Sequence, residues 1–266
     1  MESIEERILK MSNDDLGVMR ENCRNIINRT NHPQANEARR RIDAINAELV
    51  KRQMPGMIER FTIQFPEGFY GARHLEEERN YKVAACDYCQ ETLSELEMKR
   101  ILAANDWSEL FHRVKKLVSM TNLIQGGFEK PKFLDAIKDA NHASTFYYAL
   151  YAHLHGKGTP AERLGCFAKV LEQMNLLKWT YATYFLFLNE PDICMFVKPE
   201  GIKKSVQLAC YSLVYDSTPS AILYDEILQF SEWLKNQIRQ LEPRDMIDVQ
   251  SFIWYMAPTG KYSNDR

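Results

Sequence analysis

A carboxylate and several aromatic rings lie close together in the sequence near residue 250. Asp248 stands at or near the start of an apolar segment that carries Phe252, Trp254 and Tyr255. An aspartate in such a place accepts hydrogen bonds from the first amides of a helix, which makes it a structural cap. The same amides can hold the carboxylate beside an aromatic pocket, where it would stabilise a developing positive charge. The two roles are compatible, so Asp248 is the candidate catalytic residue.

Two further segments combine aromatic rings with amide side chains, the combination that stacks on a flat base and reads its edge. Residues 178–199 are rich in rings, although an aromatic helix also commonly forms core. Residues 119–128 run into a glycine-pair turn, which either ends a helix or exposes backbone N–H groups to a phosphate. The candidate rings are Trp179, Tyr181, Tyr184, Trp254 and Tyr255, and the candidate amides are Asn122, Gln125, Asn189 and Gln250.

The overall charge restricts nucleic-acid binding to a local site. The chain has 34 Lys and Arg against 36 Asp and Glu, a formal net charge of −2, whereas proteins that bind nucleic acid by charge alone are usually basic. A short basic cluster of Lys198, Lys203 and Lys204 offers candidate contacts to a DNA backbone.

Several common catalytic motifs are absent, among them a Walker-type phosphate loop, a dinucleotide fingerprint, G-x-S-x-G and H-E-x-x-H. Cys86 and Cys89 have metal-like spacing, but no second pair of soft ligands follows, so we interpret them as reduced helix cysteines. His153 and His155 are two residues apart and do not share a helix face. The sequence therefore predicts neither a metal site nor a cofactor.

Helices must position these residues. The chain has only 11 glycines in 266 residues, whereas sheet proteins and nucleotide-binding α/β folds use many glycine turns. We predict an all-α fold with a small helical N-terminal module at 1–52, a linker with one short extended piece at 53–73, and a main helical domain at 74–266. The helices of the main domain are expected at about 76–104, 107–121, 131–140, 142–155, 160–175, 179–189, 201–214, 219–240 and 247–256.

The sequence also predicts a location in the cell. The amino terminus is acidic and lacks the apolar region of a signal peptide, and no stretch approaches the roughly 18 apolar residues of a membrane span. We therefore expect a cytoplasmic protein with no membrane partner.

The segment from Ile247 to Trp254 resembles the part of helix-hairpin-helix DNA glycosylases that carries their catalytic aspartate. In that superfamily the motif opens an apolar-aromatic helix and consists of an aliphatic residue, then Asp, then either Val or Thr, then a polar residue. A long helix and a proline-containing loop precede it. The expected helix at 219–240 and Pro243 match this order. The glycine-rich hairpin of the family has no counterpart, because residues 228–241 contain no glycine. The whole chain is also similar to bacterial phage-defence proteins, which include glycosylases that remove glucosylated hydroxymethylcytosine.

The resemblance implies a DNA glycosylase in which Asp248 is the catalytic carboxylate. Its substrate would be double-stranded DNA with a modified base, such as glucosylated hydroxymethylcytosine of phage DNA, and its product an abasic site. A helical adaptor without enzymatic activity and a metal-dependent nuclease remain alternative interpretations, the latter through Asp192 and Lys198. The sequence leaves the base, a lyase step and the oligomeric state open.

Overall fold

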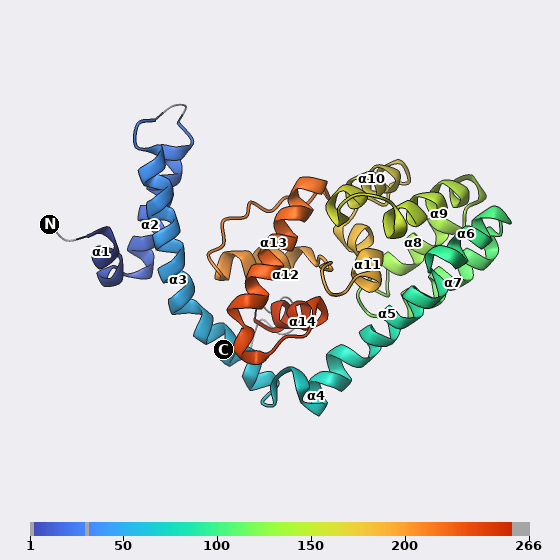
Figure 1. Ribbon diagram of the computed structural model, residues 1–266, viewed down its shortest axis with the longest axis horizontal. Helices are drawn as coiled ribbons and strands as arrows, with labels where there is room; N and C mark the ends of the chain where they lie inside the picture. The colour runs from blue at the N-terminus through green and yellow to red at the C-terminus, as the bar shows by residue number, and fades with distance from the viewer. Residues whose placement is uncertain (1–2, 30–31, 257–266) are drawn as a thin grey trace.

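The computed structural model describes residues 3–29 and 32–256, and in these ranges it contains helices and no strand (Figure 1). The predicted all-α fold is thus confirmed. The helices are α1 (Ile4–Lys10), α2 (Asn13–Ile27), α3 (Ala35–Gln64), η1 (Gly68–Tyr70), α4 (Ala72–His74), η2 (Leu75–Arg79), α5 (Asn80–Thr92), α6 (Glu95–Ala103), α7 (Trp107–Ser119), α8 (Glu129–Lys138), α9 (Ala140–His155), α10 (Pro160–Gln173), α11 (Trp179–Asn189), α12 (Pro199–Leu208), α13 (Ala221–Gln237), η3 (Arg239–Leu241) and α14 (Met246–Met256).

Most helix starts follow from local sequence. Ser12, Asp106 and Ser220 each accept a backbone N–H in the first turn of α2, α7 and α13, the contact that favours these residue types at a helix start. Thr159 and Glu162 form a reciprocal capping box at the start of α10. For this reason the starts expected at 107 and 160 agree with the structure.

The prediction of a linker at 53–73 is wrong for its first part, because α3 continues through Pro55 as far as Gln64. A proline inside a helix removes one backbone donor and crowds the preceding turn. The apolar residues Met54, Met57 and Phe61 nevertheless recur at helical spacing and are buried. Packing of this face against α14 offsets the local cost, and residues 61–64 are helical and not extended.

The first half of α3 belongs to a small helical unit with α1 and α2. Leu16 and Ile45 are buried in its apolar contacts. The guanidinium of Arg52 donates to the carbonyl oxygens of Ile8, Leu9 and Met11 at 2.7–3.2 Å, which satisfies the free end of α1. Figure 1 shows this unit at one end of the molecule, with α6 to α9 at the other.

The predicted helix at 76–104 is interrupted twice. Residues Leu75–Arg79 form a π-helix, which runs directly into α5. Helix α5 ends at its C-cap Leu93. The hydroxyl of Ser94 then accepts a hydrogen bond from the amide of Glu97 at the start of α6. Single π-turns are rare and frequently mark functional sites, so the position of this one relative to α14 is of interest.

The main core lies beneath α14 and joins residues far apart in the sequence. Phe61 of α3 packs on Phe252 of α14, with ring centroids 5.4 Å apart, and α14 also contacts α12 and α13. Among the described residues, no helix is long and apolar enough to cross a membrane.

Candidate functional site

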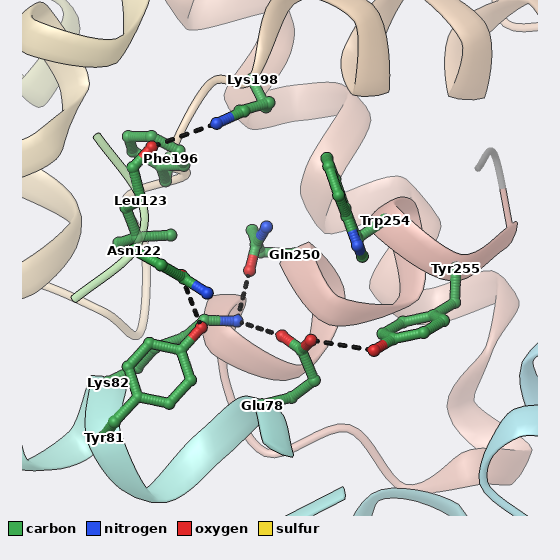
Figure 2. Close-up of a pocket in the computed structure, with 10 residues that line it drawn as sticks. All are labelled: Glu78, Tyr81, Lys82, Asn122, Leu123, Phe196, Lys198, Gln250, Trp254 and Tyr255. Atoms are coloured by element: carbon green, nitrogen blue, oxygen red, sulfur yellow. Dashed lines mark hydrogen bonds and ion pairs between the residues drawn. The ribbon is translucent and has the colours of Figure 1, made fainter. Parts of the chain in front are cut away.

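A pocket of about 210 Å³ lies between three parts of the chain (Figure 2). These are the continuous η2–α5 helix, the segment that follows α7, and helix α14. Its lining residues are Glu78, Tyr81, Lys82, Asn122, Leu123, Phe196, Lys198, Gln250, Trp254 and Tyr255. Aromatic rings, two amides, one carboxylate and two amines thus face one small space. Five of these residues were candidates from the sequence, namely Asn122, Lys198, Gln250, Trp254 and Tyr255.

A buried lysine connects the two sides of the pocket. Only 1% of Lys82 is exposed, and its Nζ donates to Glu78 Oε2 at 2.8 Å and to Gln250 Oε1 at 2.7 Å. Burial lowers the pKa of Lys82, while the carboxylate of Glu78 acts in the opposite direction. The hydroxyl of Tyr255 donates to the other oxygen of Glu78 at 3.0 Å. Glu78 is therefore held in place from both sides of the pocket.

The hydrogen bond to Lys82 fixes the orientation of the Gln250 amide, and the hydroxyl of Tyr81 contacts the Asn122 amide. An ammonium can only donate, so the oxygen of Gln250 must face Lys82 and its NH₂ group is left for the pocket. The oxygen of Asn122 likewise accepts from the hydroxyl of Tyr81 at 3.0 Å. In Figure 2 both amide nitrogens point toward the open space. The pocket therefore presents hydrogen-bond donors to a ligand.

The π-helix and the turn after it bring the carboxylate of Glu78 and the amine of Lys82 to the pocket. Glu78 lies within Leu75–Arg79 and Lys82 lies one turn later in α5, so both side chains reach α14 from the same face. The extra residue of the π-turn also directs Arg79 to α14, where it meets two aspartates.

Asp248 does not line this pocket. Its side chain is 0% exposed and contacts Arg79 Nη1 at 3.0 Å and Arg244 Nε at 2.8 Å. It also accepts the backbone N–H of Arg244 at 2.9 Å. Residues two apart on a helix face nearly opposite sides, so Gln250 faces the pocket and Asp248 faces away. This geometry gives Asp248 a structural place beneath the site.

The helix cap at this point is Asp245, which the sequence analysis did not select. Its Oδ1 accepts the amides of Ile247 and Asp248 at 3.0 and 3.3 Å. Both its oxygens bind Arg79, at 2.8 and 2.6 Å. Asp–x–x–Asp before an apolar helix is the available sequence signal, and the first of the two aspartates is the cap.

Three of the candidate rings are core residues. Tyr181 and Tyr184 are 0% exposed, and their hydroxyls donate to the carbonyl oxygens of Glu129 and Leu117 at 2.9 Å. Trp179 is 1% exposed and donates to the carbonyl of Asp216 at 3.0 Å, although its edge lines a second pocket. The expectation that the rings of Tyr181 and Tyr184 receive a base is thus corrected: α11 is buried on all sides because nearly all its residues are apolar or aromatic.

The remaining candidates lie outside the first pocket. Gln125 lines the second pocket. Asn189 ends α11, and its carbonyl accepts from Gln90 at 2.9 Å. Lys203 is exposed and Lys204 half-buried on α12. The structure does not bring these residues to the pocket of Figure 2.

Glu78, Tyr81 and Lys82 were missed from the sequence. Glu78 lies in a run of charged residues, Glu76 to Arg79, which is typical of a solvated helix face, and Tyr81 and Lys82 follow shortly after it. The Glu–x–x–x–Lys spacing is likewise common on exposed helices. Nothing local in the sequence reveals that α14 covers this face.

Cys86 and Cys89 are buried free thiols in α5. Burial raises the pKa of Cys86 to about 12, which keeps it protonated. Among the described residues there is no group of three or more His, Cys, Asp or Glu placed to hold a metal ion.

Comparisons with protein-family models, curated proteins and solved structures gave no match to the chain.

Proposed function

We propose that the pocket of Figure 2 receives a single base flipped out of DNA, and that the protein is a DNA glycosylase. The observation that supports this most is the convergence of rings, outward amide N–H groups and a held carboxylate in one pocket. A volume of about 210 Å³ lies below the range of roughly 300–1,000 Å³ for drug-sized ligands, which favours one heterocycle over a dinucleotide.

The proposal assigns the catalytic carboxylate to Glu78. As the bond between sugar and base breaks, positive charge develops on the sugar, and a nearby carboxylate stabilises it. Water then adds to the sugar carbon, and the base leaves with its electron pair and a proton. Lys82 and Tyr255 hold the two oxygens of Glu78, so little reorganisation is needed. Asp248 instead pairs with Arg79 and Arg244 behind the pocket.

The amide donors suggest which base edge is read. Gln250 and Asn122 turn their NH₂ groups to the pocket, so they match bases that present acceptor atoms, such as O2 and N3 of cytosine. Modified cytosines of phage DNA fit this chemistry and agree with the resemblance to phage-defence glycosylases. We therefore propose excision of a modified pyrimidine as an antiviral activity in the cytoplasm.

A base-release assay tests the proposal. Purified protein without added metal is incubated with duplexes that contain ordinary, uracil, alkylated, hydroxymethylated or glucosyl-hydroxymethylated bases, and alkali reveals abasic sites. We expect release from one modified substrate and a loss of at least about 100-fold in rate for Glu78→Gln, the usual size of such effects.

The matched control is Glu76→Gln, which removes an exposed carboxylate from the same π-helix. It should keep the wild-type rate. Equal rates for wild type and Glu78→Gln would refute the role of Glu78, and no release from any duplex would favour a helical binding protein without enzymatic activity.

A further inference from the structure

A second pocket of about 520 Å³ adjoins the first, and Lys198 lines both. Its wall includes Gln125, Glu129, Lys178 and Thr180. The loop between α7 and α8 separates the two spaces, because Asn122 lines one and Gln125 lines the other.

Two helices begin at this second pocket. Lys178 is the N-cap of α11 and Lys198 the N-cap of α12, and in the part of the chain that the structure describes neither lysine side chain caps its helix. The first N–H groups of a helix have no intrahelical acceptor and carry partial positive charge. The start of α11 therefore favours an anion at this place, whereas α12 begins with Pro199, which has no N–H to donate.

Thr180 gives independent evidence for a missing hydrogen-bond partner. It lies in the first turn of α11, lines the pocket and is 5% exposed. Its Oγ1 is buried and has no hydrogen-bond partner within residues 3–29 and 32–256. An unsatisfied buried hydroxyl costs about 1–3 kcal/mol, and Thr183 in the same helix is satisfied by the carbonyl of Trp179 at 2.7 Å. Thr180 thus places an unsatisfied hydroxyl in the wall of the second pocket.

The charged side chains that line the pocket have a net positive charge, which favours an anion. Lys178 and Lys198 contribute two cations, and Glu129 contributes one carboxylate. Glu129 Oε1 accepts from Lys178 at 3.0 Å and its Oε2 accepts the amide of Gln125 at 3.3 Å. Glu129 therefore occupies donors that an incoming anion would otherwise use.

We propose that this second pocket is a phosphate-binding site, in which Thr180, Lys178 and the first amides of α11 contact the phosphate group. In nucleic acid, this is the phosphate that flanks the base held in the first pocket. That placement rests on the proposed function, whereas the phosphate site itself rests only on the second pocket.

Titration with inorganic phosphate, followed by calorimetry, tests the site alone. We expect binding by the wild type, a loss of about tenfold or more in affinity for Thr180→Val and for Lys178→Met, and no change for Lys169→Met on the exposed side of α10. Glu129→Gln should bind phosphate several-fold more tightly, because it frees Lys178 and removes a like charge.

A thermal melt distinguishes loss of a ligand contact from loss of structure. Thr180→Val replaces an unsatisfied hydroxyl, so its Tm should equal or exceed that of the wild type, whereas Thr183→Val should lower it. Absence of phosphate binding, or equal affinity in wild type and Thr180→Val, would overturn the proposal.

The placement beside the base pocket is tested with 2′-deoxycytidine 5′-monophosphate and with deoxycytidine. We expect the nucleotide to bind at least tenfold more tightly than the nucleoside, and Thr180→Val to remove this advantage. Equal affinity for the two would overturn the link between the pockets. Because neither titration measures base release, failure here and failure of the glycosylase proposal are separate results.

Discussion

At the residue scale, the site depends on which carboxylates are neutralised by arginine. Asp245 and Asp248 share Arg79, and Asp248 also binds Arg244. Buried charges of this kind are stable only while each carboxylate and each guanidinium keeps a partner of opposite charge. Glu78, in contrast, has a lysine and a tyrosine as partners and borders open space. The two carboxylate environments imply different consequences of removing one charge.

We predict that Asp248→Asn destabilises the fold. The substitution leaves Arg244 and part of Arg79 without an anionic partner, and breaking a buried ion pair in this way costs about 3 kcal/mol. Urea unfolding monitored by circular dichroism measures the difference. Asp192→Asn, at an exposed position, is the control and should unfold like the wild type.

A stable Asp248→Asn variant that has lost base release would contradict this assignment. It would return the catalytic role to Asp248, as the resemblance to glycosylases implied.

At the element scale, the sequence predicts those helices whose limits are set by local chemistry. Caps such as Asp106 and Thr159 are visible in the sequence, and the helices after them agree with the structure to within a few residues. The continuation of α3 through Pro55 and the π-turn at Leu75–Arg79 were not predictable in this way, because packing against α14 stabilises both. For the same reason Lys82 was missed, although it lies within the helix predicted at 76–104: only its packing against α14 buries it.

Burial between helices also changes the chemistry of His153 in α9. Its ring stacks on Phe167 of α10 with centroids 4.3 Å apart, and burial lowers its pKa to about 3, to which the charge of Arg163 adds. An unfolded histidine titrates near pH 6.5. The folded state therefore binds fewer protons between pH 6.5 and pH 3, so this contribution to stability is complete above pH 6.5 and is lost as the pH falls.

We predict that His153→Leu removes this part of the pH dependence. In the wild type, one such group contributes a slope of up to about 1.4 kcal/mol per pH unit over this window. Urea midpoints measured from pH 7 to pH 4.5 should fall less steeply in the variant. His112→Leu, at an exposed position, is the control, and equal slopes for wild type and His153→Leu would contradict the burial argument.

At the scale of the whole molecule, α3 joins two units with distinct apolar clusters, and Cys210 of the main unit is the residue that packs into the first cluster. Its first half packs with α1 and α2 through residues such as Ile45 and Leu16, and its second half packs into the main core through Phe61. The boundary of the N-terminal module is therefore inside one continuous helix and not at a linker. Both pockets lie in the main core unit, so the N-terminal unit can change without direct contact to either.

Hydrogen exchange followed by mass spectrometry tests whether the two units open independently. Leu16→Ala creates a cavity in the N-terminal unit only, so exchange should accelerate in α1, α2 and the first half of α3 while α14 stays protected. Phe61→Ala removes the ring that contacts Phe252, at a cost of about 3–5 kcal/mol, and should accelerate exchange in α14. If Leu16→Ala exposed α14 equally, the chain would open as one cooperative unit, and a partner bound to α1 and α2 would then be able to act on the base pocket through α3.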